Sequence, residues 1–220
     1  MTSERSGGEA DFLDWIFDSD ASDLTERYDR WASTYDTDHD EWGWRGPHIA
    51  AERLMAYGPG SVVLDAGCGT GRVGVSLRSC GFEGELIGVD FSLGMLAAAE
   101  RLGVYDQLIH ATVLDLPLAK ASVDAVVSTG VFTHGHVGGE AFAELVRVGR
   151  KGAAVVITVR QDITDDLMVH ADSLEAAGEW CLVESSSPQQ LHPSRDESLQ
   201  SLVVWRILES DNEAGAMVGE

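Results

Sequence analysis

The stretch VLDAGCGTG, residues 63–71, decides the fold of this 220-residue chain. It overlaps an apolar run rich in β-branched residues, residues 61–66, and leads into residues 71–80, which carry apolar side chains at helical spacing. A short apolar run of this kind predicts a buried parallel strand, so we expect a strand that turns directly into a helix. The glycines between them, Gly67, Gly69 and Gly71, let the backbone turn sharply and let a ligand approach it closely.

The spacing of these glycines also indicates the kind of ligand. It is G-x-G-x-G, whereas the dinucleotide-binding loop has G-x-G-x-x-G. Asp65 stands at the end of the predicted strand, directly before the loop. A carboxylate at this place suits a ligand with an ammonium group better than one with a pyrophosphate.

Outward from this loop, predicted strands and helices alternate. The strands are expected at residues 85–89, 108–114, 124–129 and 153–159, and the helices at residues 92–102, 139–148 and 165–177. Two last strands, at residues 180–184 and 199–208, follow without a helix between them. Alternation predicts a parallel sheet covered on both faces, and the last pair predicts an antiparallel edge. We therefore expect a Rossmann-like α/β fold with a seven-stranded, mostly parallel sheet.

The segment before this core is rich in aromatic residues. Residues 23–57 are predicted to be helical in two pieces, broken by Gly and Pro within residues 37–47. Their aromatic side chains favour a helical lid over a ligand, although packing on the sheet would use the same residues. We expect one domain at residues 23–208, with a lid at 23–57 and a core at 58–208. Residues 1–22 are expected to be a mobile acidic N-terminus and residues 209–220 an acidic tail.

The amino-acid composition limits the classes of binding partner that this chain is expected to have. The formal net charge is -22, and only two basic residues, Lys120 and Lys151, are lysines. Such a charge repels phosphate backbones, so we expect no nucleic-acid substrate. A solvated acidic surface explains the charge better than attraction of a cationic substrate, and a saline host would give the same composition. No apolar run is long enough to span a membrane, the first residues lack a signal-peptide pattern, and the three cysteines are scattered. These features predict a cytoplasmic protein without a disulfide framework.

Two further acids follow the next two predicted strands. Asp90 comes directly after the second strand and is followed by Phe91, which is suited to packing on a flat base. A carboxylate at this place accepts hydrogen bonds from both hydroxyls of a ribose. Asp115 follows the third strand, where it is suited to accept from an exocyclic amine while the amide of Leu116 donates to a ring nitrogen. We expect these two acids and Asp65 to converge on one crevice at the carboxyl ends of the strands.

Residues 63–71 with Asp90 and Asp115 resemble the class I S-adenosylmethionine-dependent methyltransferases, and the match covers roughly residues 23–208. YDRWASTYD, residues 28–36, and TGVFTHGHV, residues 129–137, are similar to a narrower group, the methyltransferase-like proteins related to the one encoded in the Williams–Beuren chromosomal region. The resemblance implies S-adenosylmethionine as cofactor. It implies that the glycine loop and Asp65 surround the methionine part, that Asp90 holds the ribose, and that Thr129 and Gly130 lie beside the methyl group. The full cofactor site that it implies is Tyr35, Asp65, Gly67, Gly69, Gly71, Asp90, Phe91, Met95, Asp115, Leu116, Thr129 and Gly130.

His134 and His136 follow the fourth predicted strand on a glycine-punctuated loop. A neutral imidazole there would take a proton from an acceptor hydroxyl or amine, or it would only fix the loop by hydrogen bonding to the backbone. Both interpretations stay open. No third ligand with suitable spacing is nearby, so we expect no metal site.

The resulting expectation is methyl transfer from S-adenosylmethionine to a small-molecule acceptor by in-line displacement. Three other functions stay open: a cyclisation or elimination with the same cofactor, a non-catalytic binding module, and a nicotinamide-dependent oxidoreductase. The loop spacing opposes the oxidoreductase, and the small residues Thr129 and Gly130 disfavour a blocked pocket. The acceptor, its nucleophilic atom and the oligomeric state are not determined by the sequence pattern.

Overall fold

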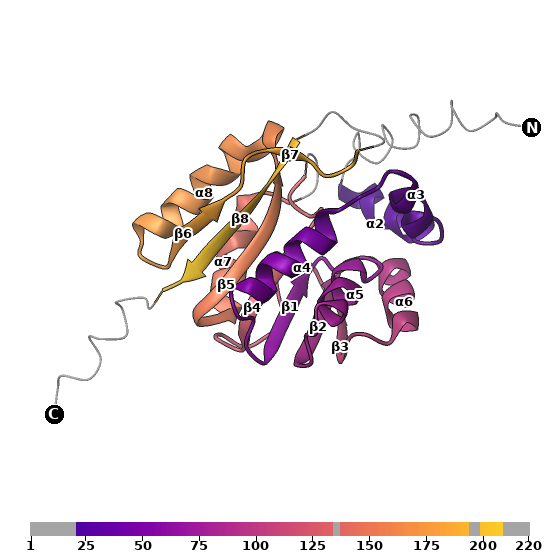
Figure 1. Cartoon of the computed structure of the whole chain (residues 1–220), viewed down its shortest axis with the longest axis horizontal. Coiled ribbons are helices and arrows are strands. Elements are labelled where there is room, and N and C mark those ends of the chain that lie inside the picture. Colours follow the sequence, from indigo (N-terminus) through magenta and orange to yellow (C-terminus); the bar gives the residue numbers. More distant parts are fainter. Residues whose placement is uncertain (1–20, 134–136, 194–198, 209–220) are drawn as a thin grey trace, which may run out of the picture.

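A computed structural model describes residues 21–133, 137–193 and 199–208 of the chain. It contains an open sheet of order β3-β2-β1-β4-β5-β8-β6, in which a two-residue strand, β7, also pairs with β8 (Figure 1). The strands are β1 (Val62–Ala66), β2 (Glu85–Asp90), β3 (Gln107–His110), β4 (Val123–Ser128), β5 (Gly149–Arg160), β6 (Trp180–Ser185), β7 (Gln189–Gln190) and β8 (Leu199–Ile207). Strands β1 to β5 pair in parallel, and β8 runs antiparallel to β5, β6 and β7. The expected Rossmann-like α/β architecture with an antiparallel strand pair is confirmed.

Helices cover both faces of this sheet. They are α2 (Ala21–Trp31), α3 (Tyr35–Glu41), α4 (Gly46–Ala56), α5 (Arg72–Ser79), α6 (Leu93–Leu102), α7 (Phe142–Val148) and α8 (Thr164–Ala176), with short 3-10 turns at Gly139–Ala141 and Gln161–Ile163. Alternate residues of β1 explain the two layers, because successive side chains of a strand point to opposite faces. Val63 packs with residues of α4 and α5, whereas Leu64 packs with residues of α7 and α8.

The N-terminal helices divide between two roles. Ala50, Ala51 and Leu54 of α4 are fully buried against α5 and the sheet, so α4 belongs to the sheet-covering layer. Helices α2 and α3 instead lie near α6 and the start of α5 (Figure 1). Of the segment expected to be a lid, residues 23–57, only α2 and α3 lie outside the sheet-covering layer. We use the name lid for these two helices, and their role as a lid stays a prediction. α3 occupies part of the segment that was expected to break the helical pattern.

The third strand is shorter than expected. It ends at His110 instead of Leu114, and the chain then turns back on itself. The turn is held by the amide of Leu114, which donates to Thr112 Oγ1 at 3.2 Å, and by the amide of Asp115, which donates to the carbonyl of Thr112 at 3.2 Å. A threonine side chain that bonds its own backbone competes with the sheet ladder. This early turn decides which of the following residues reach the crevice.

Candidate active site

A cavity of about 300 Å³ opens at the carboxyl ends of the central strands, beneath the lid helix α2. It is lined by Leu24, Thr25, Tyr28, Tyr35, Gly67, Gly69, Asp90, Phe91, Met95, Ala111, Thr112, Val113, Leu114, Thr129, Gly130, Val131 and Val137. The predicted cofactor residues among these are Tyr35, Gly67, Gly69, Asp90, Phe91, Met95, Thr129 and Gly130. Asp65, Gly71, Asp115 and Leu116 do not line it.

The glycine loop is hydrogen-bonded to the neighbouring strand β2. The amides of Gly67 and Cys68 both donate to the carbonyl of Val89, at 2.8 and 2.9 Å. Gly67 has φ +78°, and a Cβ on it would lie 2.1 Å from Val131 Cγ2. Gly69 has φ +53°, and a Cβ on it would meet nothing within 4 Å. Gly67 is thus required by packing, whereas Gly69 leaves open space for a ligand against the backbone.

Asp90 is held at the floor of the cavity by backbone amides. Its Oδ2 accepts from the amide of Gly69 at 2.8 Å, and its Oδ1 accepts from the amide of Ser92 at 2.9 Å. Burial raises the pKa of Asp90 to about 6, although the amide hydrogen bonds favour the charged form. Each carboxylate oxygen has a further lone pair, so Asp90 is still able to accept from ligand hydroxyls.

Asp65 lies beneath the loop and is fully buried. Its Oδ2 accepts from the hydroxyl of Tyr105 at 2.6 Å. Its Oδ1 has no hydrogen-bond partner among the residues that the structure describes. Burial raises the pKa of Asp65 to about 7, and the charge of Asp90 raises it as well, while the Tyr105 hydrogen bond lowers it. Asp65 thus lies close enough to Asp90 for the two charges to interact, and Tyr105 is a neighbour that the sequence did not reveal.

Asp115 and Leu116 are placed away from the cavity. The amide of Leu116 donates to Glu144 Oε2 at 2.9 Å, so it is not available to a ligand, and Asp115 is exposed. The cause is the early end of β3, after which Thr112, Val113 and Leu114 face the cavity instead. Of the three acids expected to converge on one crevice, only Asp90 lines the cavity. Asp65 is buried close to Asp90 without lining the cavity, and Asp115 is exposed.

Gly71 begins a helix and does not face the cavity. It is the N-cap of α5 with φ +98°, and a Cβ on it would lie 2.9 Å from Leu102 and 3.1 Å from Tyr105. Its part in the site is to let α5 start close to the neighbouring segments.

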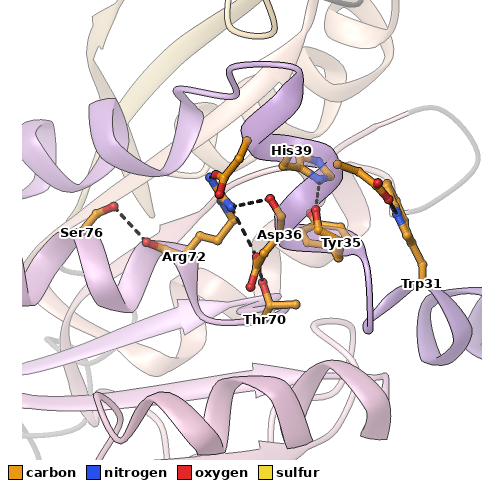
Figure 2. A network of polar contacts seen from close by, with 9 residues as sticks. Trp31, Tyr35, Asp36, His39, Thr70, Arg72 and Ser76 are labelled. Atoms are coloured by element: carbon orange, nitrogen blue, oxygen red, sulfur yellow. Dashed lines mark hydrogen bonds and ion pairs between the residues drawn. The ribbon is translucent and has the colours of Figure 1, made fainter. Parts of the chain in front are cut away.

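Two carboxylates tie the lid to the loops that carry the cavity residues. Asp36 of α3 accepts a 2.7 Å hydrogen bond from Thr70 Oγ1 in the glycine loop, and Arg72 lies close to both Asp36 and Asp40 (Figure 2). Asp29 of α2 accepts from Ser92 Oγ at 2.6 Å and from the amide of Gly94 at 2.8 Å. A carboxylate is favourable at a helix N-terminus, and Asp29 occupies this place on α6. These contacts join residues 34 to 65 positions apart, so no local pattern predicts them.

Two smaller spaces share lining residues with the main cavity. A narrow slot of about 20 Å³ shares Tyr35, Gly67, Gly69 and Thr129 with it and is also lined by Arg72. On the other side, a chamber of about 60 Å³ shares Tyr28, Tyr35 and Gly130 with it. We call this second space the aromatic chamber. Its remaining lining is Trp31, His39, Trp44, Thr133, Arg160, His192 and Gln200.

The aromatic chamber has a tightly packed wall. The rings of Tyr35 and His39 stack with centroids 4.0 Å apart, and those of Trp44 and His192 stack with centroids 5.4 Å apart. His39 Nδ1 lies 2.9 Å from the carbonyl oxygen of Tyr35. Gly130 lines both the chamber and the main cavity, and a Cβ on it would lie 3.3 Å from Trp44. A side chain here would therefore crowd the ring of Trp44.

The predicted base residues His134 and His136 lie outside the described residues, so they stay a prediction. Within residues 21–133, 137–193 and 199–208, no group of three or more His, Cys, Asp or Glu side chains is arranged to hold a metal ion. In the same part of the chain, no helix is both long and apolar enough to cross a membrane. The expected cytoplasmic location stays a prediction.

Comparison with known proteins gives consistent matches. The family described as "Methyltransferase domain" matches residues 64–157. Human methyltransferase-like protein 27 is 37% identical over 164 residues, which cover 70% of this chain and 66% of that protein. Demethylmenaquinone methyltransferase of Thermobifida fusca is 34% identical over 151 residues, which cover 64% of this chain and 62% of that protein. The chain thus spans at most about two thirds of the length of these curated relatives.

Solved structures share the fold. A chain from the complex between the Haloferax volcanii Trm112 methyltransferase activator and a methyltransferase superposes with a TM-score of 0.64 at 21% identity, covering 83% of this chain and 98% of that one. At this identity the likeness concerns the fold alone. The fold, the glycine loop and the sequence matches together define a protein of the Rossmann-like methyltransferase class. The chain belongs to the class I S-adenosylmethionine-dependent methyltransferases.

Proposed function

We propose that this chain binds S-adenosylmethionine in the main cavity and transfers its methyl group to a small-molecule acceptor held in the aromatic chamber. One observation carries the proposal: Gly130, two residues after the end of β4, lines both spaces, as Tyr28 and Tyr35 do. The narrow slot reaches this place from the side of the glycine loop. A methyl donor that spans the slot and the main cavity would therefore present its sulfonium to the chamber.

The residues present fit an adenosyl sulfonium. Asp90 offers carboxylate oxygens to the ribose hydroxyls, and the open face of Gly69 gives the ligand room against the backbone. Phe91 and Met95 on one side, with Val113 and Leu114 on the other, would hold the adenine between apolar surfaces. The slot would take the methionine part, and Arg72 in its lining would meet the carboxylate. Asp65 is buried two residues before the lining residue Gly67, and its unpartnered Oδ1 would accept from the amino group.

The chamber supports a small and largely apolar acceptor. Its volume is about 60 Å³, and aromatic rings form most of its wall. Aromatic walls favour flat or cationic ligands. Arg160, His192 and Gln200 stand among the polar groups that would orient the acceptor. The net charge of -22 argues against a nucleic-acid acceptor.

The chain's part in the reaction is mainly positioning. Bound S-adenosylmethionine supplies an already activated methyl group. Tyr28 and Tyr35 close the cavity from the lid and exclude water, while Gly130 leaves the line of attack open. Alignment of two reactants contributes about 7–11 kcal/mol to catalysis, so a general base is not required for a nucleophile that is already neutral and reactive. His134 and His136 remain the proposed bases for an acceptor that must lose a proton.

Calorimetry with S-adenosylmethionine and S-adenosylhomocysteine tests the first step, and we expect both to bind. Incubation with a methyl-labelled cofactor and a metabolite extract, followed by mass spectrometry, tests the second step. We expect a labelled small molecule and one equivalent of released S-adenosylhomocysteine. Failure of both ligands to bind at high micromolar concentration would overturn the cofactor proposal. Turnover without release of S-adenosylhomocysteine would instead favour a cyclisation or elimination on the same fold.

A further inference from the structure

Tyr105, in the segment between α6 and β3, packs against the backbone at three glycines. A Cβ on Gly74 would lie 2.6 Å from the ring of Tyr105, one on Gly88 would lie 3.0 Å from it, and one on Gly71 would lie 3.1 Å from it. These glycines come from three separate elements: α5, β2 and the glycine loop. The tyrosine ring therefore occupies space that side chains would otherwise fill, and its orientation is fixed by close packing.

The hydrogen bonds of the Tyr105 hydroxyl have a defined direction. Gly74 is the third residue of α5, and the amides of the first helical turn have no partner inside the helix. The amide of Gly74 donates to Tyr105 Oη at 3.2 Å. The single hydroxyl hydrogen of Tyr105 is then directed at Asp65 Oδ2, 2.6 Å away. One oxygen of Asp65 is thus engaged and the other, Oδ1, is left.

The remaining oxygen is in an unfavourable state in the absence of a ligand. Asp65 is fully buried, and its Oδ1 has no partner among the described residues. A buried acceptor without a donor costs free energy, which an incoming donor would recover. The narrow slot proposed for the methionine part of the cofactor is lined by Gly67 and Cys68, two and three residues after Asp65. Asp65 itself lies behind this lining, so its free oxygen is close to the slot along the chain.

We propose that Tyr105 is a positioning residue for cofactor binding, which holds the Asp65 carboxylate so that its free oxygen receives the amino group of the methionine moiety. The inference rests on the proposed cofactor function and adds to it a residue outside the cavity lining. The Tyr105 hydroxyl also favours the charged form of Asp65, whose pKa burial raises. Without this donor the carboxyl group would hold its proton to higher pH and would be a poorer partner for an ammonium group.

The test is Tyr105→Phe, which keeps the ring between the three glycines and removes only the hydroxyl. Binding is measured by calorimetry for S-adenosylmethionine and for 5′-methylthioadenosine, which lacks the amino-acid part. We expect the variant to bind S-adenosylmethionine about tenfold more weakly at pH 7 and 5′-methylthioadenosine as the unchanged protein does; hydrogen bonds to charged groups are of this magnitude. Between pH 6 and pH 8 the deficit should shrink, since deprotonation of Asp65 becomes easier.

Tyr57→Phe is the matched control. Its hydroxyl donates to Glu184 at 2.8 Å, and neither residue lines the main cavity, the narrow slot or the aromatic chamber. Loss of this hydroxyl should therefore leave both affinities unchanged. Equal losses for the two ligands in Tyr105→Phe would indicate a general packing role and would overturn the inference, as would no loss at all.

A second variant keeps the inference testable if Tyr105→Phe does not fold. Asp65→Asn should show the same selective loss for S-adenosylmethionine, and an unchanged affinity would overturn the inference. If the unchanged protein bound neither ligand, the cofactor proposal would fail, and the role of Tyr105 would fail with it. If the unchanged protein bound both ligands, any failure would concern Tyr105 and Asp65 alone.

Discussion

Thr70 Oγ1 donates a 2.7 Å hydrogen bond to Asp36 Oδ1, and this contact joins the glycine loop directly to the lid helix α3 (Figure 2). Thr70 is buried, whereas Asp36 is half-exposed and also lies next to Arg72. Because Tyr35 is adjacent to Asp36 and lines the main cavity, the contact determines where the lid meets the proposed cofactor.

Substitution of Thr70 by Val should weaken binding of S-adenosylmethionine about tenfold. The new side chain has nearly the same shape, but it cannot hold Asp36, so the lid would spend more time away from the cavity. A hydrogen bond to a carboxylate is worth about 1.5–3 kcal/mol. Calorimetry gives the affinity, and thermal unfolding shows whether the fold is kept.

Thr34→Val is the control for this change. The Thr34 hydroxyl donates to Asp38 Oδ2 at 3.0 Å, but the contact stays inside the lid segment. We expect an affinity within twofold of the unchanged protein. Equal effects of both substitutions would contradict a special role for the contact between loop and lid.

Gly69→Ala should abolish cofactor binding without preventing folding. Its φ of +53° disfavours a side chain, yet nothing lies within 4 Å of the new methyl group, which would point into the space proposed for the ligand. Gly81→Ala is a matched control, because Gly81 has φ +88° and is equally open. We expect a similar loss of about 1 kcal/mol in the free energy of unfolding for both, but loss of binding for Gly69→Ala alone. Normal binding by Gly69→Ala would place the ligand elsewhere.

The buried acids predict how the stability of the ligand-free protein depends on pH. The folded-state pKa values of Asp65 and Asp90 are about 7 and about 6, above the value of about 4 in an unfolded chain. The folded protein therefore binds protons more tightly than the unfolded one. Their stabilising contribution is complete below about pH 4 and is lost as the pH rises to about 7.

Asp65→Asn should remove the part of this pH-dependent loss of stability that is due to Asp65. We expect its melting temperature to exceed that of the unchanged protein by several degrees at pH 8, and the difference to be much smaller at pH 5; about 2–4 °C corresponds to 1 kcal/mol for a domain of this size. Differential scanning calorimetry without cofactor measures it. Asp115→Asn, at an exposed position, controls for the overall charge. A gain that is equal at both pH values would show that Asp65 does not change its charge between pH 5 and pH 8.

The sequence and the structure assign different residues to the part of the cavity proposed for adenine, and substitutions distinguish the two assignments. Asp115→Asn should change the affinity for S-adenosylmethionine less than twofold, because Asp115 does not line the cavity. Leu114→Ala should weaken it several-fold, since Leu114 does line the cavity and would lose apolar contact with the base. Calorimetry on the two variants shows whether Asp115 or Leu114 contributes to cofactor binding. A large effect of Asp115→Asn would restore the expectation derived from the sequence.

The residues 63–71 were sufficient to predict the strand, the glycine loop and the helix in their order, because strand and helix periodicities and the conformational freedom of glycine are local properties. Asp65 and Asp90 could be placed together for a related reason. Asp65 is the last residue but one of β1 and Asp90 is the last of β2, and these strands are parallel neighbours, so both acids lie at the carboxyl edge of the sheet.

Contacts between distant segments were decided only by the tertiary structure. Asp36 meets Thr70 across 34 positions, Tyr105 meets Asp65 across 40 and Asp29 meets Ser92 across 63, and none of these pairs has a local pattern. Whether Asp115 lines the cavity depended on whether the third strand ended at His110 or at Leu114. The chain itself thus determined the fold and the two central acids, whereas packing between distant elements determined which groups hold those acids and which residues reach the ligand.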